Sequence, residues 1–191
     1  WFNQAAIQNK PSAQYNLGFM YEKGLGTEQN LYSAFDWYKR AALKGLAIAQ
    51  FKIGEMYFKG KGVFQDYKVA RRWYTIAAEQ NHSPAQFELG KIYERGKGTA
   101  VDKKTAFQWY KKAAEENNTN AQLKLGLIYY DGIYTNRDLE QAFIWLKIAA
   151  NEGNDKAKQK LIVVKRSFDQ AALNRAKNRT LTCITTQFKR C

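Results

Sequence analysis

The apolar and polar residues near the start of this chain alternate with the period of an α-helix. Four apolar side chains stand at intervals i, i+4, i+7 and i+8, which places them on one side of a helix. They are Ala13, Leu17, Met20 and Tyr21. The stretch then reaches Gly24 and Gly26, and glycine readily adopts the left-handed backbone found after a helix C-terminus. The pattern therefore predicts an amphipathic helix that ends near Lys23.

A second helix is predicted directly after this turn. Asn30 is a favourable N-cap residue, and Ala34, Trp37 and Ala41 follow it at helical spacing. Gly45 closes the helix. The unit is thus a pair of helices joined by a short turn.

The same unit returns every 36 residues. The residues that recur are Ala13, Ala49, Ala85, Ala121 and Ala157; Gly18, Gly54, Gly90 and Gly126; Tyr21, Tyr57, Tyr93 and Tyr129; and Trp37, Trp73, Trp109 and Trp145. Asp66, Asp102 and Asp138 repeat the N-cap position of Asn30. Trp1 fits the same frame, so the chain is expected to begin within the second helix of a preceding unit.

Stacking explains why such a unit is repeated. A single helical hairpin cannot bury its own apolar face, whereas stacked hairpins share a continuous core. Each tryptophan withdraws about 150–250 Å² from water, worth at most about 4–6 kcal/mol before entropy. Gly18 stands at the flank of the apolar stripe, where the lack of a Cβ lets a neighbouring helix come close. The repeat therefore predicts an all-α stack in which the recurring residues are structural.

The frame A-x3-LG-x2-Y-x2-G-x-G…D-x3-A-x2-WY-x2-AA resembles the Sel1-like repeat, a relative of the tetratricopeptide repeat, over about residues 1–165. The resemblance implies a right-handed superhelical solenoid of antiparallel helix pairs with 36-residue repeats. In the fourth unit Tyr134 replaces a glycine and Leu146 replaces the tyrosine of the Trp-Tyr pair, so its loop is expected to differ in shape. The fifth unit keeps Ala157 and Leu161 but loses the glycine and the tyrosine, which is typical of a capping helix.

The chain is expected to contain the end of one repeat, four further repeats, capping helices and a basic tail with two cysteines. The bounds are 1–12 for the preceding repeat, 13–48, 49–84, 85–120 and 121–156 for the four repeats, 157–178 for the capping helices and 179–191 for the tail. Within the tail, "TLTCITTQF" is rich in β-branched residues. Irregular, extended and strand-paired conformations are all compatible with that stretch.

Positive charge is concentrated near the C-terminus. The formal net charge is +14, and residues 156–191 hold ten basic residues and one acidic residue. This segment is either a solvated basic tail or an electrostatic contact for a polyanion or an acidic partner surface. Its assigned residues are Lys165, Arg166, Arg175, Lys177, Arg179, Lys189 and Arg190.

Two cysteines, Cys183 and Cys191, lie in the same segment. An even count in one short stretch favours a disulfide, provided that the compartment is oxidising. A periplasmic or secreted location is therefore predicted, with a cytoplasmic location and two free thiols as the alternative. No metal is expected, because two thiolates lack partners and His82 is the only histidine. No stretch approaches the roughly 18 apolar residues of a transmembrane segment.

The sequence offers no catalytic set. His82 lies in a loop before a helix, without an evident nucleophile or orienting group. The loops "KGKGV" and "GKGTAVDKK" lack the spacing and the preceding strand of a phosphate-binding loop, so they are interpreted as turns. We therefore expect neither an enzyme nor a cofactor.

The face of the first helices is the candidate partner surface. With the recurring alanine as position one, positions three, seven and ten lie opposite the core stripe and should line the concave side, and position four adjoins them. The residues assigned to partner binding are Tyr15, Phe19, Phe51, Lys52, Glu55, Phe58, Phe87, Lys91, Lys124 and Tyr130; the same positions also hold Glu22, Glu88, Glu94, Leu123 and Leu127. Aromatic and charged side chains there suit a peptide or a partner helix. The alternative is that position three belongs to the core.

Two functions follow from these features. The first is a non-catalytic scaffold or adaptor that binds a partner protein along the concave face; the resemblance implies assembly or signalling adaptors, many in bacterial envelopes. The alternative is binding of a polyanion, such as nucleic acid, an anionic membrane or a cell-wall polymer, through the basic C-terminal segment. Acidic residues are interspersed with basic ones in the repeats, which disfavours nucleic acid.

Overall fold

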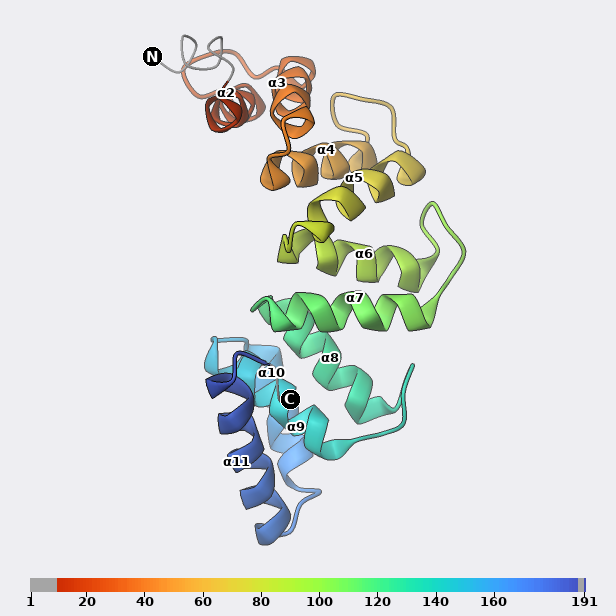
Figure 1. The fold of residues 1–191 in the computed structure, drawn as a ribbon, viewed down its shortest axis with the longest axis vertical. Coiled ribbons are helices and arrows are strands. Elements are labelled where there is room, and N and C mark those ends of the chain that lie inside the picture. Colours follow the sequence, from red (N-terminus) through yellow and green to blue (C-terminus); the bar gives the residue numbers. More distant parts are fainter. Residues whose placement is uncertain (1–9, 189–190) are drawn as a thin grey trace. The chain divides into compact units, whose positions relative to one another are not determined.

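The computed structural model describes residues 10–188 and residue 191, and helices joined by short turns make up this part of the chain (Figure 1). The chain divides into two compact units, residues 1–101 and 102–191, and each is described by itself. The described residues form ten helices and no strand. This confirms the all-α class predicted from the repeat.

Helices alternate within each unit as first and second members of a pair. The first unit contains α2 (Pro11–Lys23), α3 (Leu31–Leu43), α4 (Ala47–Lys59), α5 (Tyr67–Glu79) and α6 (Ser83–Arg95). The second contains α7 (Lys103–Glu115), α8 (Thr119–Asp131), α9 (Leu139–Asn151), α10 (Asp155–Lys165) and α11 (Gln170–Thr185). Consecutive helices pack against each other from α2 through α6 in the first unit and from α7 through α10 in the second, so neighbouring helix pairs within a unit share a core.

The second helices begin at the predicted N-caps. The side-chain oxygens of Asn30 and Asp102 each accept a hydrogen bond from the backbone N–H three residues later, at 3.0 and 2.9 Å. Asp66 and Asp138 cap α5 and α9 in the same way. These bonds satisfy amides that have no partner within the helix.

The fourth repeat keeps its left-handed turn without the glycine. Tyr134 has a φ of 76°, against 70° for Gly26 at the equivalent position. At this residue the backbone therefore keeps the conformation of the glycine, although a Cβ makes that conformation less favourable.

The tyrosine of each Trp-Tyr pair is the most deeply buried aromatic residue of its repeat. Tyr38, Tyr74 and Tyr110 are at most 1% exposed, whereas the neighbouring Trp37, Trp73 and Trp109 are half-buried. The tyrosines pack where the first helices carry glycine: a Cβ on Gly18 would lie 2.8 Å from the Tyr38 ring, and one on Gly54 would lie 2.7 Å from Tyr74. The recurring glycine thus allows the close helix approach that the sequence predicts, and the side chain that fills the space is the tyrosine of the next helix.

A buried glutamine links each repeat to the one before it. The Gln50 side-chain N–H donates to the Ala42 carbonyl at 3.1 Å, and Gln86 donates to Ala78 at 3.1 Å. The acceptors lie in the last turn of the preceding second helix, where carbonyls lack an intrahelical donor. Gln122 repeats the contact in the second unit, so this residue type also recurs every 36 residues for a structural reason.

The C-terminal segment is helical further than expected. The helix α11 runs to Thr185, so the division at residues 178 and 179 does not coincide with a helix end. The stretch from Thr180 to Thr185 is neither irregular nor a strand. Its hydroxyl groups are satisfied by backbone carbonyls of the preceding turn, as in the 2.7 Å bond from Thr180 to Ala176, and this makes a β-branched stretch compatible with a helix.

The cap helix α11 packs against α9 (Figure 1). Ile144 and Ile148 of α9 are buried, although the positions of Ile144 in earlier repeats hold Asp36, Arg72 and Gln108, all exposed. Because α11 packs on α9 alone among the second helices of the described residues, we infer that it covers them. On α10, Ile162 occupies the position of the packing glycine and is 56% exposed. Because an isoleucine fills the space that glycine leaves for a tyrosine, a second helix cannot approach α10 as α5 approaches α4.

The end of the chain also contacts α9. Phe188 stacks on Trp145 with ring centroids 5.8 Å apart, and Trp145 is only 1% exposed. Cys183 and Cys191 form a disulfide with Cα atoms 4.7 Å apart, and the Gln141 side chain donates to the Cys191 carbonyl at 2.6 Å. The disulfide therefore links α11 to the residue at the chain end, and Phe188, between the two cysteines in sequence, covers Trp145.

Candidate protein-binding face

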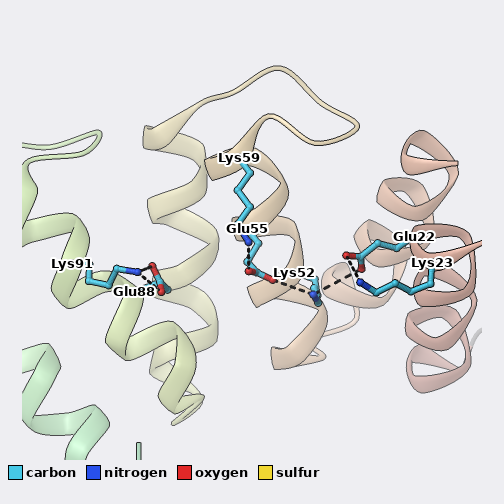
Figure 2. A network of polar contacts seen from close by, with 7 residues as sticks. All are labelled: Glu22, Lys23, Lys52, Glu55, Lys59, Glu88 and Lys91. Carbon is cyan, nitrogen blue, oxygen red and sulfur yellow. Dashed lines mark hydrogen bonds and ion pairs between the residues drawn. The ribbon is translucent and has the colours of Figure 1, made fainter. Parts of the chain in front are cut away.

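The side chains assigned to partner binding lie on the first helices of the pairs. We call this surface the first-helix face: positions three, four, seven and ten of α2, α4 and α6 in the first unit, and of α8 and α10 in the second. Figure 2 shows Glu22, Lys52, Glu55, Glu88 and Lys91 of this face with the adjacent Lys23 and Lys59, and in it Lys52 of α4 points toward Glu22 of α2. The two parts of the face differ in chemistry and are described separately.

In the first unit, the charged residues neutralise one another. The Lys52 ammonium lies 3.1 Å from the Glu55 carboxylate and 3.9 Å from Glu22 on α2 (Figure 2). Lys59 lies 2.8 Å from Glu55, and Lys91 of α6 lies 2.7 Å from its neighbour Glu88. Two of the assigned lysines are thus engaged within the chain.

Burial and charge act in opposite directions on this network. Burial by itself lowers the pKa of Lys52, but the carboxylates of Glu55 and Glu22 hold it above its ordinary value. Burial also raises the pKa of Glu55, yet the hydrogen bond from Lys59 and the charge of Lys52 bring it below its ordinary value. Both groups therefore stay ionised at neutral pH.

Glu22 is also tied to the core. The Tyr38 hydroxyl donates to its carboxylate at 2.6 Å. The pKa of Tyr38 is raised by burial first and by this hydrogen bond second. The carboxylate at position ten of α2 therefore satisfies the only polar atom of a buried tyrosine side chain.

The aromatic residues at position three are half-buried: they contact the tyrosines of the core and remain partly accessible at the surface. The Tyr15 ring centroid lies 5.3 Å from that of Tyr38, and the Phe51 centroid lies 5.5 Å from that of Tyr74. Phe58, at position ten of α4, packs edge-on against Tyr67 at 5.0 Å. Phe19 at position seven is 38% exposed, so it is the more accessible aromatic residue of this face.

In the second unit, the first helices α8 and α10 form an apolar groove. Its lining residues are Leu123, Leu127, Lys156, Gln159, Lys160 and Val163, around a volume of about 280 Å³. Lys160 places its ammonium 3.8 Å from the centroid of the Tyr130 ring, and Lys124 lies 5.6 Å from the Tyr110 ring. The assigned residues Lys124 and Tyr130 thus adjoin a surface that the sequence only partly revealed.

The residues that sequence analysis missed come from α10. This helix was expected to act as a cap, so its positions three, four and seven, occupied by Gln159, Lys160 and Val163, were not assigned to the face. Continuing the 36-residue frame by one more unit places all three beside Leu123 and Leu127. The frame itself was therefore the signal that could have found them.

The basic C-terminal residues that the structure describes are distributed over two helices. Lys165 and Arg166 end α10, and Arg175 and Lys177 are exposed on α11. Arg179 is engaged by Glu140 of α9 at 2.9 Å. Lys189 and Arg190 lie outside the described residues.

His82 has a structural role. Its Nδ1 accepts a hydrogen bond from the Ala85 N–H at 3.3 Å and so caps α6, and its ring centroid lies 4.9 Å from that of Phe51. Burial lowers the pKa of His82. Over residues 10–188 and residue 191, no three potential metal ligands come together, and no described helix is both long and apolar enough to cross a bilayer.

Comparison with known proteins places the repeats in a family. The model of the Sel1 repeat matches residues 11–46, 47–82, 83–118 and 119–154, a frame that begins two residues before the expected one. A search of the curated proteins gave no significant match.

Solved structures agree with this match. A protective antigen of uropathogenic Escherichia coli with an SLR fold is 37% identical with a TM-score of 0.82, over 84% of this chain and 34% of its own. A Sel1 repeat protein from Oxalobacter formigenes is 35% identical with a TM-score of 0.76, over 80% of this chain and 62% of its own. Cysteine-rich protein B of Helicobacter pylori, 21% identical with a TM-score of 0.58 over 69% of this chain and 98% of its own, shares the fold.

The chain thus spans about a third of the length of the first of these relatives and less than two thirds of the second. Four matched repeats, helix pairs of the predicted period and two relatives above 30% identity agree on one architecture. The chain belongs to the Sel1 repeat family, and its fold is that of the Sel1-like solenoids.

Proposed function

We propose that this chain is a non-catalytic scaffold that binds a partner protein along its first-helix face. Proteins built from Sel1 repeats are generally scaffolds for protein–protein interaction and generally lack catalytic activity. Within such a scaffold, the partner contacts should use surface residues that packing does not require.

One observation carries the proposal. The constant alanines and glycines within the helices are buried, as Ala49, Gly54 and Ala77 are. Positions four and seven stay at the surface and change from repeat to repeat. At position four they read Asn16, Lys52, Glu88 and Lys124, and at position seven Phe19, Glu55, Lys91 and Leu127. The surface residues thus differ between repeats, whereas the packing residues are the same. Such variation is suited to the recognition of one particular partner.

The compartment is part of the proposal. The disulfide between Cys183 and Cys191 supports an oxidising compartment, since cytosolic thiols are kept reduced. The similarity to a protective antigen is consistent with a periplasmic or secreted scaffold in a larger envelope complex. Mass spectrometry of the unreduced protein from its natural host tests this point, and free thiols would contradict it.

The excess of basic residues in 156–191 favours a second candidate, polyanion binding. Such binding falls steeply with salt as counterions are released. Deleting the cap is not a suitable test, because α11 covers apolar residues of α9. The double variant Arg175→Gln, Lys177→Gln removes two exposed charges instead, and it should leave a partner bound at the first-helix face in place.

Site-specific photo-crosslinking in the native host tests the scaffold proposal. A crosslinker at Phe19 or Leu127 on the first-helix face should capture one partner, and a crosslinker at Gln108, exposed on the second helix α7, should not capture it. Capture of the partner only from Gln108 would contradict the assignment of the face.

A further inference from the structure

We propose that the groove between α8 and α10 binds an acidic amphipathic segment of the partner protein. This inference rests on the scaffold function proposed above and names the chemistry of its partner. Two features of the second unit carry it: an apolar floor, and a basic rim with no acidic residue among the residues that line the groove.

The floor of the groove is formed by Leu123 and Leu127 of α8 and Val163 of α10. Val163 is 43% exposed and the two leucines are half-buried. The volume of about 280 Å³ is below the roughly 300–1,000 Å³ usual for small-molecule sites. It is suited to a few apolar side chains that project from a longer ligand.

The rim is positively charged. Lys156 and Lys160 line the groove, and the residues that line it include no carboxylate. The Tyr130 ring beside it is approached by two cations, Lys160 at 3.8 Å and Arg137 at 5.4 Å. The ring holds the two cations at the edge of the groove, and their charges make the local potential positive.

The same positions in the first unit carry the opposite balance. Positions four, seven and ten of α2, α4 and α6 hold four acidic and two basic residues. They are Glu22, Glu55, Glu88 and Glu94, with Lys52 and Lys91. On α8 and α10 these positions hold three basic residues and no acidic one, namely Lys124, Lys160 and Arg166. Of the basic residues on these two helices, Lys156 and Lys160 line the groove itself, and carboxylates of a partner can complement their charge.

The combination favours an acidic protein segment over other anions. A nucleic-acid backbone neutralises lysines but offers no aliphatic group for Leu123 and Leu127. An amphipathic helix presents apolar residues at i and i+4 with carboxylates beside them, and it can therefore fill the floor and meet the rim together.

The test uses a fluorescein-labelled, 16-residue designed peptide of glutamate and alanine with leucines at i, i+4 and i+7. Its affinity for the whole chain is measured by fluorescence anisotropy. A peptide of the same composition with the leucines dispersed, and a single-stranded DNA of 16 nucleotides, serve as comparison probes. The leucine-patterned peptide is expected to bind roughly tenfold more tightly than the dispersed one.

A matched pair of charge reversals identifies the site. Lys160→Glu alters the rim and is expected to weaken peptide binding by roughly tenfold or more. Lys158→Glu makes the same change on the same helix, but Lys158 is exposed and pairs with Asp155, so it should change the affinity less than about twofold. Leu127→Ala should also weaken the peptide, and circular dichroism checks that each variant keeps its helices.

Three outcomes would overturn the inference: equal effects of Lys158→Glu and Lys160→Glu, equal affinity for both peptides, or DNA binding that is equally sensitive to Lys160→Glu. These results would indicate unspecific charge attraction or a nucleic-acid surface. The scaffold function is judged separately by crosslinking from Phe19 and Leu127. If Lys160→Glu leaves binding of the crosslinked partner unchanged, the groove does not bind an acidic segment, whereas the scaffold function is not contradicted.

Discussion

At the scale of the residue, glycine and tyrosine determine how closely the helices of a pair approach. Gly54 of α4 faces Tyr74 of α5, and the ring occupies the space where a Cβ would lie, 2.7 Å from the nearest ring carbon. A glycine in the middle of a helix lowers its stability by about 1 kcal/mol relative to alanine. The contact with the tyrosine must offset that loss in each repeat where the pair occurs.

Gly54→Ala is therefore expected to destabilise the chain by about 1–3 kcal/mol, although alanine is the better helix former. Urea unfolding followed by circular dichroism measures the change. In a Tyr74→Ala background the ring is gone, and the same substitution should become neutral or stabilising. An equal effect in both backgrounds would show that the tyrosine is not the cause.

His82 makes stability depend on pH. Its Nδ1 must be unprotonated to accept the Ala85 N–H, and its folded pKa lies below the ordinary value of 6.5 because of burial. The stability that it provides is thus complete above pH 6.5 and is lost as the pH falls through the folded pKa.

His82→Asn tests this dependence, because Asn118 and Asn154 cap α8 and α10 at the equivalent positions. Urea unfolding at pH 7.5 and pH 5 should show a larger loss for the native chain than for the variant. The carboxylates titrate in both proteins and cancel in the comparison. Equal losses would mean that the histidine contributes nothing to the pH dependence.

At the scale of the element, α11 acts as the cap of the second unit, and α9 is adapted to receive it. Ile144 is fully buried, at the position where α5 exposes Arg72, and we infer that α11 covers it. The two residues form a matched pair for mutation, since one has a covering helix and the other does not.

Ile144→Asp should destabilise the chain by roughly 3 kcal/mol, because a carboxylate is placed in an apolar site without a partner. Arg72→Asp should change the stability by less than about 0.5 kcal/mol, as is usual for exposed positions. Chemical unfolding of both variants provides the comparison. A small effect at residue 144 would mean that α11 does not cover it in solution.

Reducing the disulfide should loosen the cap. For a loop with a sequence separation of eight, loop closure accounts for roughly 2–3 kcal/mol. Phe188 would then leave Trp145, and the fluorescence emission should shift to the red. The variant Trp145→Phe should lose most of the shift, and Cys191→Ser should not respond to reductant at all.

At the scale of the whole molecule, the two units should respond independently to local damage. In repeat proteins each unit contacts only its neighbours, so destabilisation spreads over short distances. Ile144→Asp should speed hydrogen exchange in α9 and α11, whereas the amides of α3 to α5 should exchange as in the native chain. A uniform increase along the chain, measured by mass spectrometry, would indicate a single cooperative unit instead.

The parts that could be predicted from the sequence are those governed by neighbouring residues. Asn30 and Asp102 cap helices through side chains that reach only three residues ahead, and the period of 36 residues follows from counting. The helical state of Thr180–Thr185 could not be predicted, because β-branched residues favour strands and the helix gains its stability from docking on α9.

The groove was only partly predictable for a similar reason. Lys124 and Tyr130 were assigned, but Val163 and Lys160 belong to a helix that had been interpreted as a cap. The helix α10 both follows the last matched repeat and lines the groove with α8, and only the structure shows that its groove-lining residues are accessible.

Ile162 has a consequence for how proteins of this architecture change length. With isoleucine at the glycine position of α10 and isoleucines on the outer face of α9, the end of the array is encoded locally and does not depend on how many units precede it. Duplication of any 36-residue segment upstream would lengthen the protein and leave this terminus intact. A unit added after α10 would need Ile162→Gly before it could dock as α5 docks on α4. We therefore expect repeats to be gained by internal duplication and not by addition after α10.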